Sequence, residues 1–114
     1  MKPQRISIAD DFHKAPGGRY NRDGPFSGQA FRDQLLIPAL KDGNAVEINM
    51  DGTIGLGGAF LEEAFGGLVR AGFDPADLRK RLTIISYIDA YRDRIWRYID
   101  TANAQKLHQL HASS

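Results

Sequence analysis

A short alternating stretch followed by a glycine-rich connection constrains the fold of this chain most strongly. Apolar and polar residues alternate strictly over residues 46–50, which is the pattern of a strand buried on one face. Residues 51–58 are rich in glycine, and apolar residues then recur at helical spacing as far as Leu68. A strand, a tight connection and an amphipathic helix in this order predict one unit of an α/β sheet.

The chain before this unit predicts a first strand and a first helix. Residues 5–9 alternate, with Ile6 and Ile8 on one face, and residues 13–25 form a loop with a short strand near 19–20. Ser27 is a good N-cap for the helix that follows. Pro38 cannot donate a backbone hydrogen bond, so we expect a kink or break near Ile37.

The chain after this unit adds a strand and two helices. Asp74 followed by Pro75 predicts a helix start, residues 82–87 predict a strand, and residues 88–102 predict the last helix. The fold class is therefore α/β, with a mixed sheet of about four strands covered by three to four helices. One domain spans residues 1–114, with a core at about 5–103 and a polar tail, 104–114, that we expect to fray.

Composition argues against several classes of function. Fifteen basic against fourteen acidic residues leave a net charge of +1, which favours neither nucleic acid nor a membrane surface as a partner. The chain has no cysteine, which excludes disulfides and thiolate metal sites and fits a reducing compartment. We therefore expect a cytoplasmic protein.

No constellation in the sequence predicts catalysis, a metal or a cofactor. Glu62 and Glu63 are adjacent, and neighbours on a helix point about 100° apart, so they do not converge on one substrate atom. His108 and His111 lie three residues apart without an acidic third ligand, so we expect no metal. No serine or histidine lies in a hydrolase or protease motif, so we expect no enzyme.

The segment 51–70, DGTIGLGGAFLEEAFGGLVR, resembles the central signature of a STAS-like family of unknown function, which is related to anti-sigma-factor antagonists. Residues 16–20, 23–28, 31–32 and 95–99 are similar to the same family, so the resemblance spans about residues 5–103. It implies a STAS-like fold and a non-catalytic regulatory module that binds a protein partner. The partner it implies is a histidine-kinase-like ATPase.

In anti-sigma antagonists the helix after this strand contacts the partner, and phosphorylation of a hydroxyl at its start breaks the complex. This chain departs from that pattern with Gly57, Gly58 and Ala59; the nearest hydroxyl, Thr53, is the candidate for phosphorylation. Substitution of Phe60 or Glu63 would then weaken the complex and leave the fold intact. The resemblance thus assigns partner contacts to the 51–70 loop and helix, at Gly57, Gly58, Phe60, Glu62, Glu63, Gly66, Gly67 and Arg70.

Other interpretations of these residues stand beside this one. The Gly52–Gly58 loop is compatible with a small-ligand or nucleotide site, although it matches neither a P-loop nor a dinucleotide fingerprint. Gly66–Gly67 indicates either close approach of a neighbouring element or a flat docking patch. Trp96 indicates either an interface, such as that of a homo-oligomer, or stacking with the flanking Arg92 or Arg97. Arg19 either pairs with Asp23 or Asp51 or binds an acidic partner or a phosphate.

Overall fold

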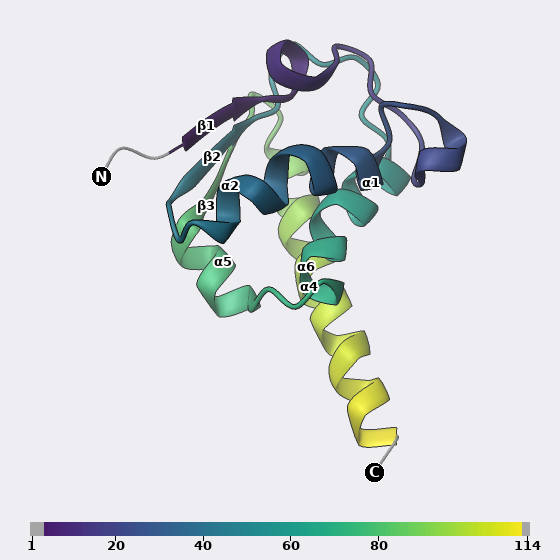
Figure 1. Cartoon of the computed structure of the whole chain (residues 1–114), viewed down its shortest axis with the longest axis vertical. Coiled ribbons are helices and arrows are strands. Elements are labelled where there is room, and N and C mark those ends of the chain that lie inside the picture. Colours follow the sequence, from purple (N-terminus) through teal and green to yellow (C-terminus); the bar gives the residue numbers. More distant parts are fainter. Residues whose placement is uncertain (1–3, 113–114) are drawn as a thin grey trace.

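The computed structural model describes residues 4–112, and it contains a three-stranded sheet packed on one side by helices (Figure 1). The strands are β1 (Gln4–Ser7), β2 (Val46–Asn49) and β3 (Leu82–Ile85), in the order β1-β2-β3. Both neighbouring pairs are parallel, and the register places Ile6, Ile48 and Ile84 side by side across the sheet. The α/β class is as predicted.

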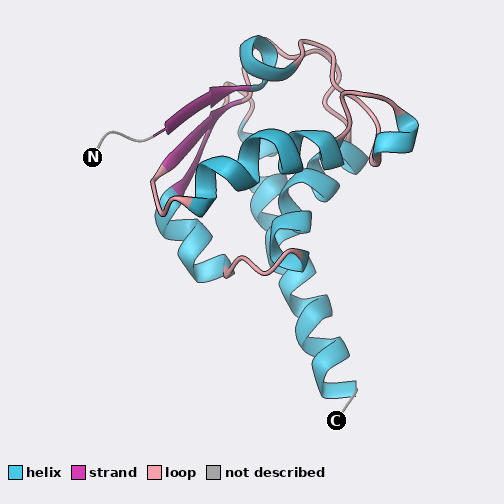
Figure 2. Cartoon of the chain, in the orientation of Figure 1, coloured by secondary structure: helices cyan, strands magenta, loops and turns pink. Residues whose placement is uncertain are grey.

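The strand order explains why the helices lie on one face (Figure 2). Crossovers between parallel strands are right-handed in nearly all proteins. The chain moves in the same direction across the sheet from β1 to β2 and from β2 to β3, so both connections lie on the same face of the sheet. The alternating strands fit this arrangement, because alternation marks a half-buried sheet. Ile6, Val46, Ile48, Leu82 and Ile84 face the helices and are buried. The residues on the open face are Arg5, Ser7, Glu47, Asn49, Thr83 and Ile85.

The sheet corrects two features of the prediction, since it has three strands rather than about four and is parallel rather than mixed. The short strand expected near 19–20 is absent because the chain turns there. Gly18 has a φ of +91°, and the 3₁₀ turn η2 (Asn21–Asp23) follows, with the N–H of Tyr20 donating to Asp23 Oδ2 at 2.9 Å. The first strand ends at Ser7, and Ile8 begins the π turn η1 (Ile8–Phe12).

The first long helix contains a π turn. It runs through α1 (Gly28–Phe31), η3 (Arg32–Leu36) and α2 (Ile37–Lys41). Ser27 is its N-cap as predicted, since Oγ accepts the N–H of Ala30 at 3.1 Å. The expected kink or break near Ile37 is a π turn instead, in which the N–H of Ile37 donates to the carbonyl of Arg32. The chain therefore stays helical through Pro38, directly after the wider turn.

The second long helix has the same construction and is the most enclosed element. It runs through α3 (Gly58–Leu61), η4 (Glu62–Gly66) and α4 (Gly67–Arg70), and Gly72, with a φ of +108°, lies just beyond its end. Phe60 packs against Phe31, with ring centroids 5.9 Å apart. Residues 63–69 are all buried, because the first long helix and the last helix cover this second helix from two sides.

The last two helices are α5 (Pro75–Arg81) and α6 (Asp89–Ala112). Ile95, Ile99 and Ala102 of α6 are buried against η4 and α4. Beyond Asn103 the helix continues to residue 112 and extends past the body of the molecule (Figure 1), and the side chains of residues 104–110 are exposed. The tail expected to fray, 104–114, is thus helical as far as residue 112, and residues 113–114 lie outside the described part.

Among residues 4–112, no helix combines the length and the apolar character needed to cross a bilayer. The cytoplasmic location stays a prediction.

Candidate functional site

Three arginines and two glutamates meet where the two π turns face each other; we call Arg19, Arg32, Glu62, Glu63 and Arg70 the ion-pair cluster. Arg19 Nη1 lies 2.5 Å from Glu62 Oε1, and Arg32 Nη1 lies 2.5 Å from Glu63 Oε2. Arg70 joins the two carboxylates, with Nη1 at 2.8 Å from Glu62 Oε2 and Nη2 at 3.3 Å from Glu63 Oε1. The cluster ties the early loop and both long helices together.

The convergence of the two carboxylates was not expected from their adjacency. The π turn η4 places both on the side of the helix that meets the arginines, and its wider ring closes with the N–H of Gly67 donating to the carbonyl of Glu62. The guanidinium of Arg70 then reaches both carboxylates at once. Arg19 forms an ion pair within the domain, but its partner is Glu62 rather than the expected Asp23 or Asp51.

Gly66 and Gly67 make room for this arrangement. A Cβ atom at Gly67 would lie 2.3 Å from Arg32 Nη1. A Cβ atom at Gly66 would lie 2.4 Å from Glu62 Oε2 and 3.4 Å from the carbonyl oxygen of Tyr98 in α6. The close-approach interpretation of this pair is therefore confirmed. The alternative, a flat patch that docks a partner, is wrong because both glycines are buried.

The cluster makes part of the folding stability depend on pH. Burial would raise the pKa of Glu62, but hydrogen bonds from Arg70 and Arg19 outweigh that effect and lower the pKa. A carboxyl whose pKa is lower in the folded state stabilises the fold above its unfolded pKa, about 4.3, and loses that contribution as the pH falls.

We therefore expect Glu62→Gln to destabilise the protein at neutral pH and to matter less in acid. The difference in urea midpoint between wild type and variant should shrink as the pH falls from about 6 to about 3. Urea unfolding followed by circular dichroism at several pH values measures it. Asp89→Asn is a control, because that carboxylate is exposed and pairs with its helical neighbour Arg92. A constant difference across the range would contradict the role given to Glu62.

The structure places the expected partner-contact residues largely inside the molecule. Phe60 is 1% exposed and Glu63 is 7% exposed, so neither forms a contact surface, and their substitution would disturb the fold rather than spare it. Glu62 is half-buried and engaged by two arginines. Of the expected contact residues, Gly57 and Arg70 are exposed and Gly58 is half-buried. The guanidinium of Arg70 is bound to Glu62.

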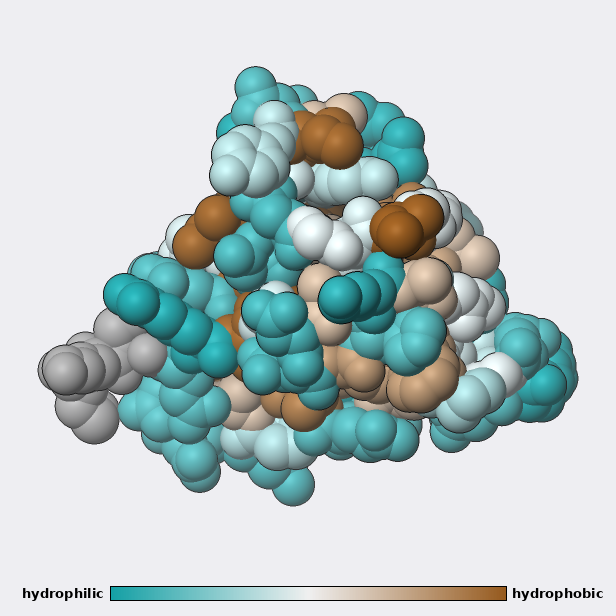
Figure 3. All heavy atoms as spheres, turned by 90° about the horizontal axis from the view of Figure 1, so that it is seen from above, coloured by the Kyte–Doolittle hydropathy of each residue, from teal (hydrophilic) through white to brown (hydrophobic). Residues whose placement is uncertain are grey.

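The loops at the carboxyl end of the sheet carry apolar side chains that face solvent. Ile54 is 70% exposed, Tyr87 is 90% exposed and Ile88 is 52% exposed, and Ile85 lies at the end of β3. We call these four residues the apolar rim. Figure 3 looks down on this end and shows brown patches standing among teal and white surface. No pattern in the sequence distinguished these four residues, because the exposure of a loop side chain depends on which strand ends lie side by side in the fold.

Hydrogen bonds hold the loops of the rim in place. Asp51 Oδ1 accepts the N–H of Tyr87 at 2.9 Å, which joins the loops after β2 and β3. The N–H of Ile54 donates to the carbonyl of Lys14 at 2.7 Å, which joins the loop after β2 to the early loop. Thr53 Oγ1 donates to the carbonyl of Met50 at 2.7 Å, so the candidate hydroxyl for phosphorylation is engaged within its own turn. The nucleotide alternative for Gly52–Gly58 stays a prediction.

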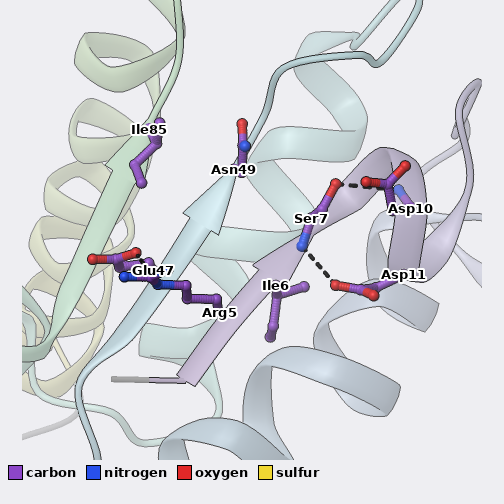
Figure 4. Close-up of a pocket in the computed structure, with 8 residues that line it drawn as sticks. All are labelled: Arg5, Ile6, Ser7, Asp10, Asp11, Glu47, Asn49 and Ile85. Carbon is purple, nitrogen blue, oxygen red and sulfur yellow. Dashed lines mark hydrogen bonds and ion pairs between the residues drawn. The ribbon is translucent and has the colours of Figure 1, made fainter. Parts of the chain in front are cut away.

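A shallow hollow lies on the open face of the sheet beside the rim (Figure 4). Arg5 reaches across to Glu47 on β2, with Nε 3.1 Å from Oε2. Ser7 caps the turn after β1, since its Oγ accepts the N–H of Asp10 at 3.2 Å and its own N–H donates to Asp11 Oδ2 at 2.7 Å. These contacts tie polar groups that line the hollow to one another.

The remaining residues singled out from the sequence lie apart from the rim. His108 is exposed on α6, and the side chain of His111 lies outside the described part. Trp96 is half-buried, and the arginine that stacks on it is Arg79, whose Cζ is 4.7 Å from the ring centroid, rather than the flanking Arg92 or Arg97. Arg79 also pairs with Asp100.

The fold and the site together define a small α/β domain with a parallel sheet covered on one face and loops clustered at its carboxyl end. Residues 27–90 match the model of a family described as a STAS-like domain of unknown function, and the chain belongs to that family. This confirms the resemblance seen in the sequence. No curated protein and no solved structure matches the chain.

Proposed function

We propose that this protein is a non-catalytic regulatory module that binds a protein partner through the apolar rim. The observation that carries the proposal is the exposure of Ile54, Tyr87 and Ile88 on neighbouring loops. Large apolar side chains that face water in one region favour association, and aromatic residues are enriched in binding sites. Loops on a rigid sheet are also where binding residues concentrate.

The family resemblance implied a surface made of the 51–70 loop and helix. The proposed surface keeps the loop and replaces the helix. The loop 51–57 remains, because Ile54 lies at its exposed tip. The helix that follows is enclosed, so the loop after β3, which is hydrogen-bonded to Asp51 at the start of the loop after β2, takes its place. A histidine-kinase-like ATPase is the partner proposed, on the strength of the relation of STAS-like domains to anti-sigma-factor antagonists.

The chemistry of the buried carboxylates supports binding rather than catalysis. A general acid or base near neutral pH needs a pKa close to the working pH. Hydrogen bonds from arginines lower the pKa of Glu62 despite its burial, which is the opposite direction. Glu63 forms ion pairs with Arg32 and Arg70. The cluster thus serves to tie the early loop to both long helices.

An affinity capture from host lysate, with and without ATP, tests the proposal. The wild type is compared with Ile54→Ser and Tyr87→Ser, and with Leu107→Ser as a matched control, since Leu107 is an apolar residue of α6 that is 48% exposed. We expect one ATPase to be retained by wild type and control, and its recovery to fall at least about tenfold with each rim variant. Equal recovery with all four proteins would reject the rim as the binding surface.

A further inference from the structure

A second hollow lies between the end of α4 and the middle of α6, away from the apolar rim. Its volume is about 360 Å³, and its lining contains two cations, two carboxamides and one small apolar residue: Arg70, Lys106, Gln105, Gln109 and Ala102. In Figure 1 the end of α4 and this part of α6 lie well below the loops at the carboxyl end of the sheet. None of the lining side chains is a carboxylate.

The charge around this hollow is positive. Arg70 is the positive group on the α4 side of the lining, while the ion-pair cluster behind it is balanced, because Arg32 also pairs with Asp33. Lys106 adds a further positive charge on the facing helix. The sequence contains no aspartate or glutamate after Asp100, so this half of α6 offers no competing anion.

Both cations are held in position before any ligand arrives. Arg70 forms two hydrogen bonds to Glu62, at 2.8 and 3.1 Å, which orient the plane of its guanidinium. Lys106 Nζ donates to the carbonyl of Val69 at 3.3 Å, at the last turn of α4. An ammonium has three donors and a guanidinium has five, so each group keeps N–H donors for a further acceptor. Groups ordered in advance lose less entropy when a ligand binds.

We propose that this hollow binds the phosphate group of a small molecule, with Arg70 and Lys106 as the charged donors and Gln105 as an amide donor. Charge-assisted hydrogen bonds from arginine and lysine are the usual contacts of phosphate oxygens. A volume of about 360 Å³ lies at the lower end of small-molecule sites, which suits a phosphate monoester of metabolite size. The site is independent of the proposed partner surface.

A titration followed by backbone amide NMR tests this site. Inorganic phosphate and glycerol 3-phosphate are added separately at constant ionic strength, with sodium chloride as the reference salt. We expect saturable shifts at residues 67–71 and 102–109, and tighter binding of the monoester if the rest of the hollow contributes. Tighter binding of glycerol 3-phosphate than of inorganic phosphate assigns the site to an organic phosphate. Equal affinity for the two overturns the assignment to a phosphate monoester and leaves a site for free phosphate.

Variants of Lys106 decide whether the hollow itself is responsible. Lys106→Gln should weaken binding about fivefold, and Lys106→Arg should restore it, because the arginine keeps the charge. Lys41→Gln removes an exposed charge at the end of α2 and should leave the affinity unchanged. The proposal is overturned by shifts that do not saturate, by shifts spread over all basic residues, or by equal affinity in Lys106→Gln and wild type.

Discussion

Replacing Glu63 with glutamine is expected to lower the free energy of unfolding by about 3 kcal/mol. The variant leaves the guanidinium of Arg32 buried without its closest counter-charge, since the two groups are 2.5 Å apart and both are largely shielded from water. Loss of one partner of a buried ion pair typically costs about 3–5 kcal/mol. We place this case at the lower end because Arg32 also pairs with Asp33 at 2.9 Å.

Urea unfolding at neutral pH measures this effect, and a second ion pair provides the matched control. Arg5→Gln removes one partner of the Arg5–Glu47 pair, in which the arginine side chain is 79% exposed, so its cost should stay below about 1 kcal/mol. A double-mutant cycle of Arg32→Gln with Glu63→Gln should show a coupling of at least about 1 kcal/mol. Equal costs for Glu63→Gln and Arg5→Gln would show that the cluster is not desolvated.

The sequence predicted those parts of the fold that depend on neighbours in the chain. The alternation over residues 46–50 identified a half-buried strand, and Ser27 identified the start of a helix, because both signals act within a few residues. The number of strands was overestimated at residues 19–20. There the backbone of Gly18 and the hydrogen bond between Tyr20 and Asp23 create a turn that composition alone does not distinguish from a short strand.

The candidate site depended on two facts that a local pattern does not contain. Helical spacing assumes α-helical geometry, so a π turn at 62–66 and its effect on Glu62 and Glu63 could not be read from adjacency. The burial of Phe60 results from contacts with the first long helix, and that of Gly66 involves the last helix. A family signature marked this segment as important, but it did not separate residues that hold the fold from residues that face a partner.

The approach of the two long helices gives the second large prediction. A Cβ atom at Gly28 would lie 2.4 Å from the backbone carbonyl oxygen of Phe60 and 3.2 Å from the backbone nitrogen of Ala64. Backbone atoms cannot rotate away as the end of a side chain can, so the helices must separate. Alanine favours a helix over glycine by about 1 kcal/mol, but overpacking of this kind costs about 1–3 kcal/mol or more. We expect Gly28→Ala to be destabilising by about 2 kcal/mol net.

Two further alanine variants show whether the backbone contact is the cause. Gly17→Ala should change the unfolding free energy by less than about 0.5 kcal/mol, because no atom lies within 4 Å of the added Cβ. Gly67→Ala meets only the end of the Arg32 side chain, so the arginine should move and release Glu63. Its effect should therefore overlap with that of Glu63→Gln, whereas the effect of Gly28→Ala should add to it. Urea unfolding of the single and double variants measures both outcomes, and a neutral Gly28→Ala would mean that the two helices are free to separate without cost.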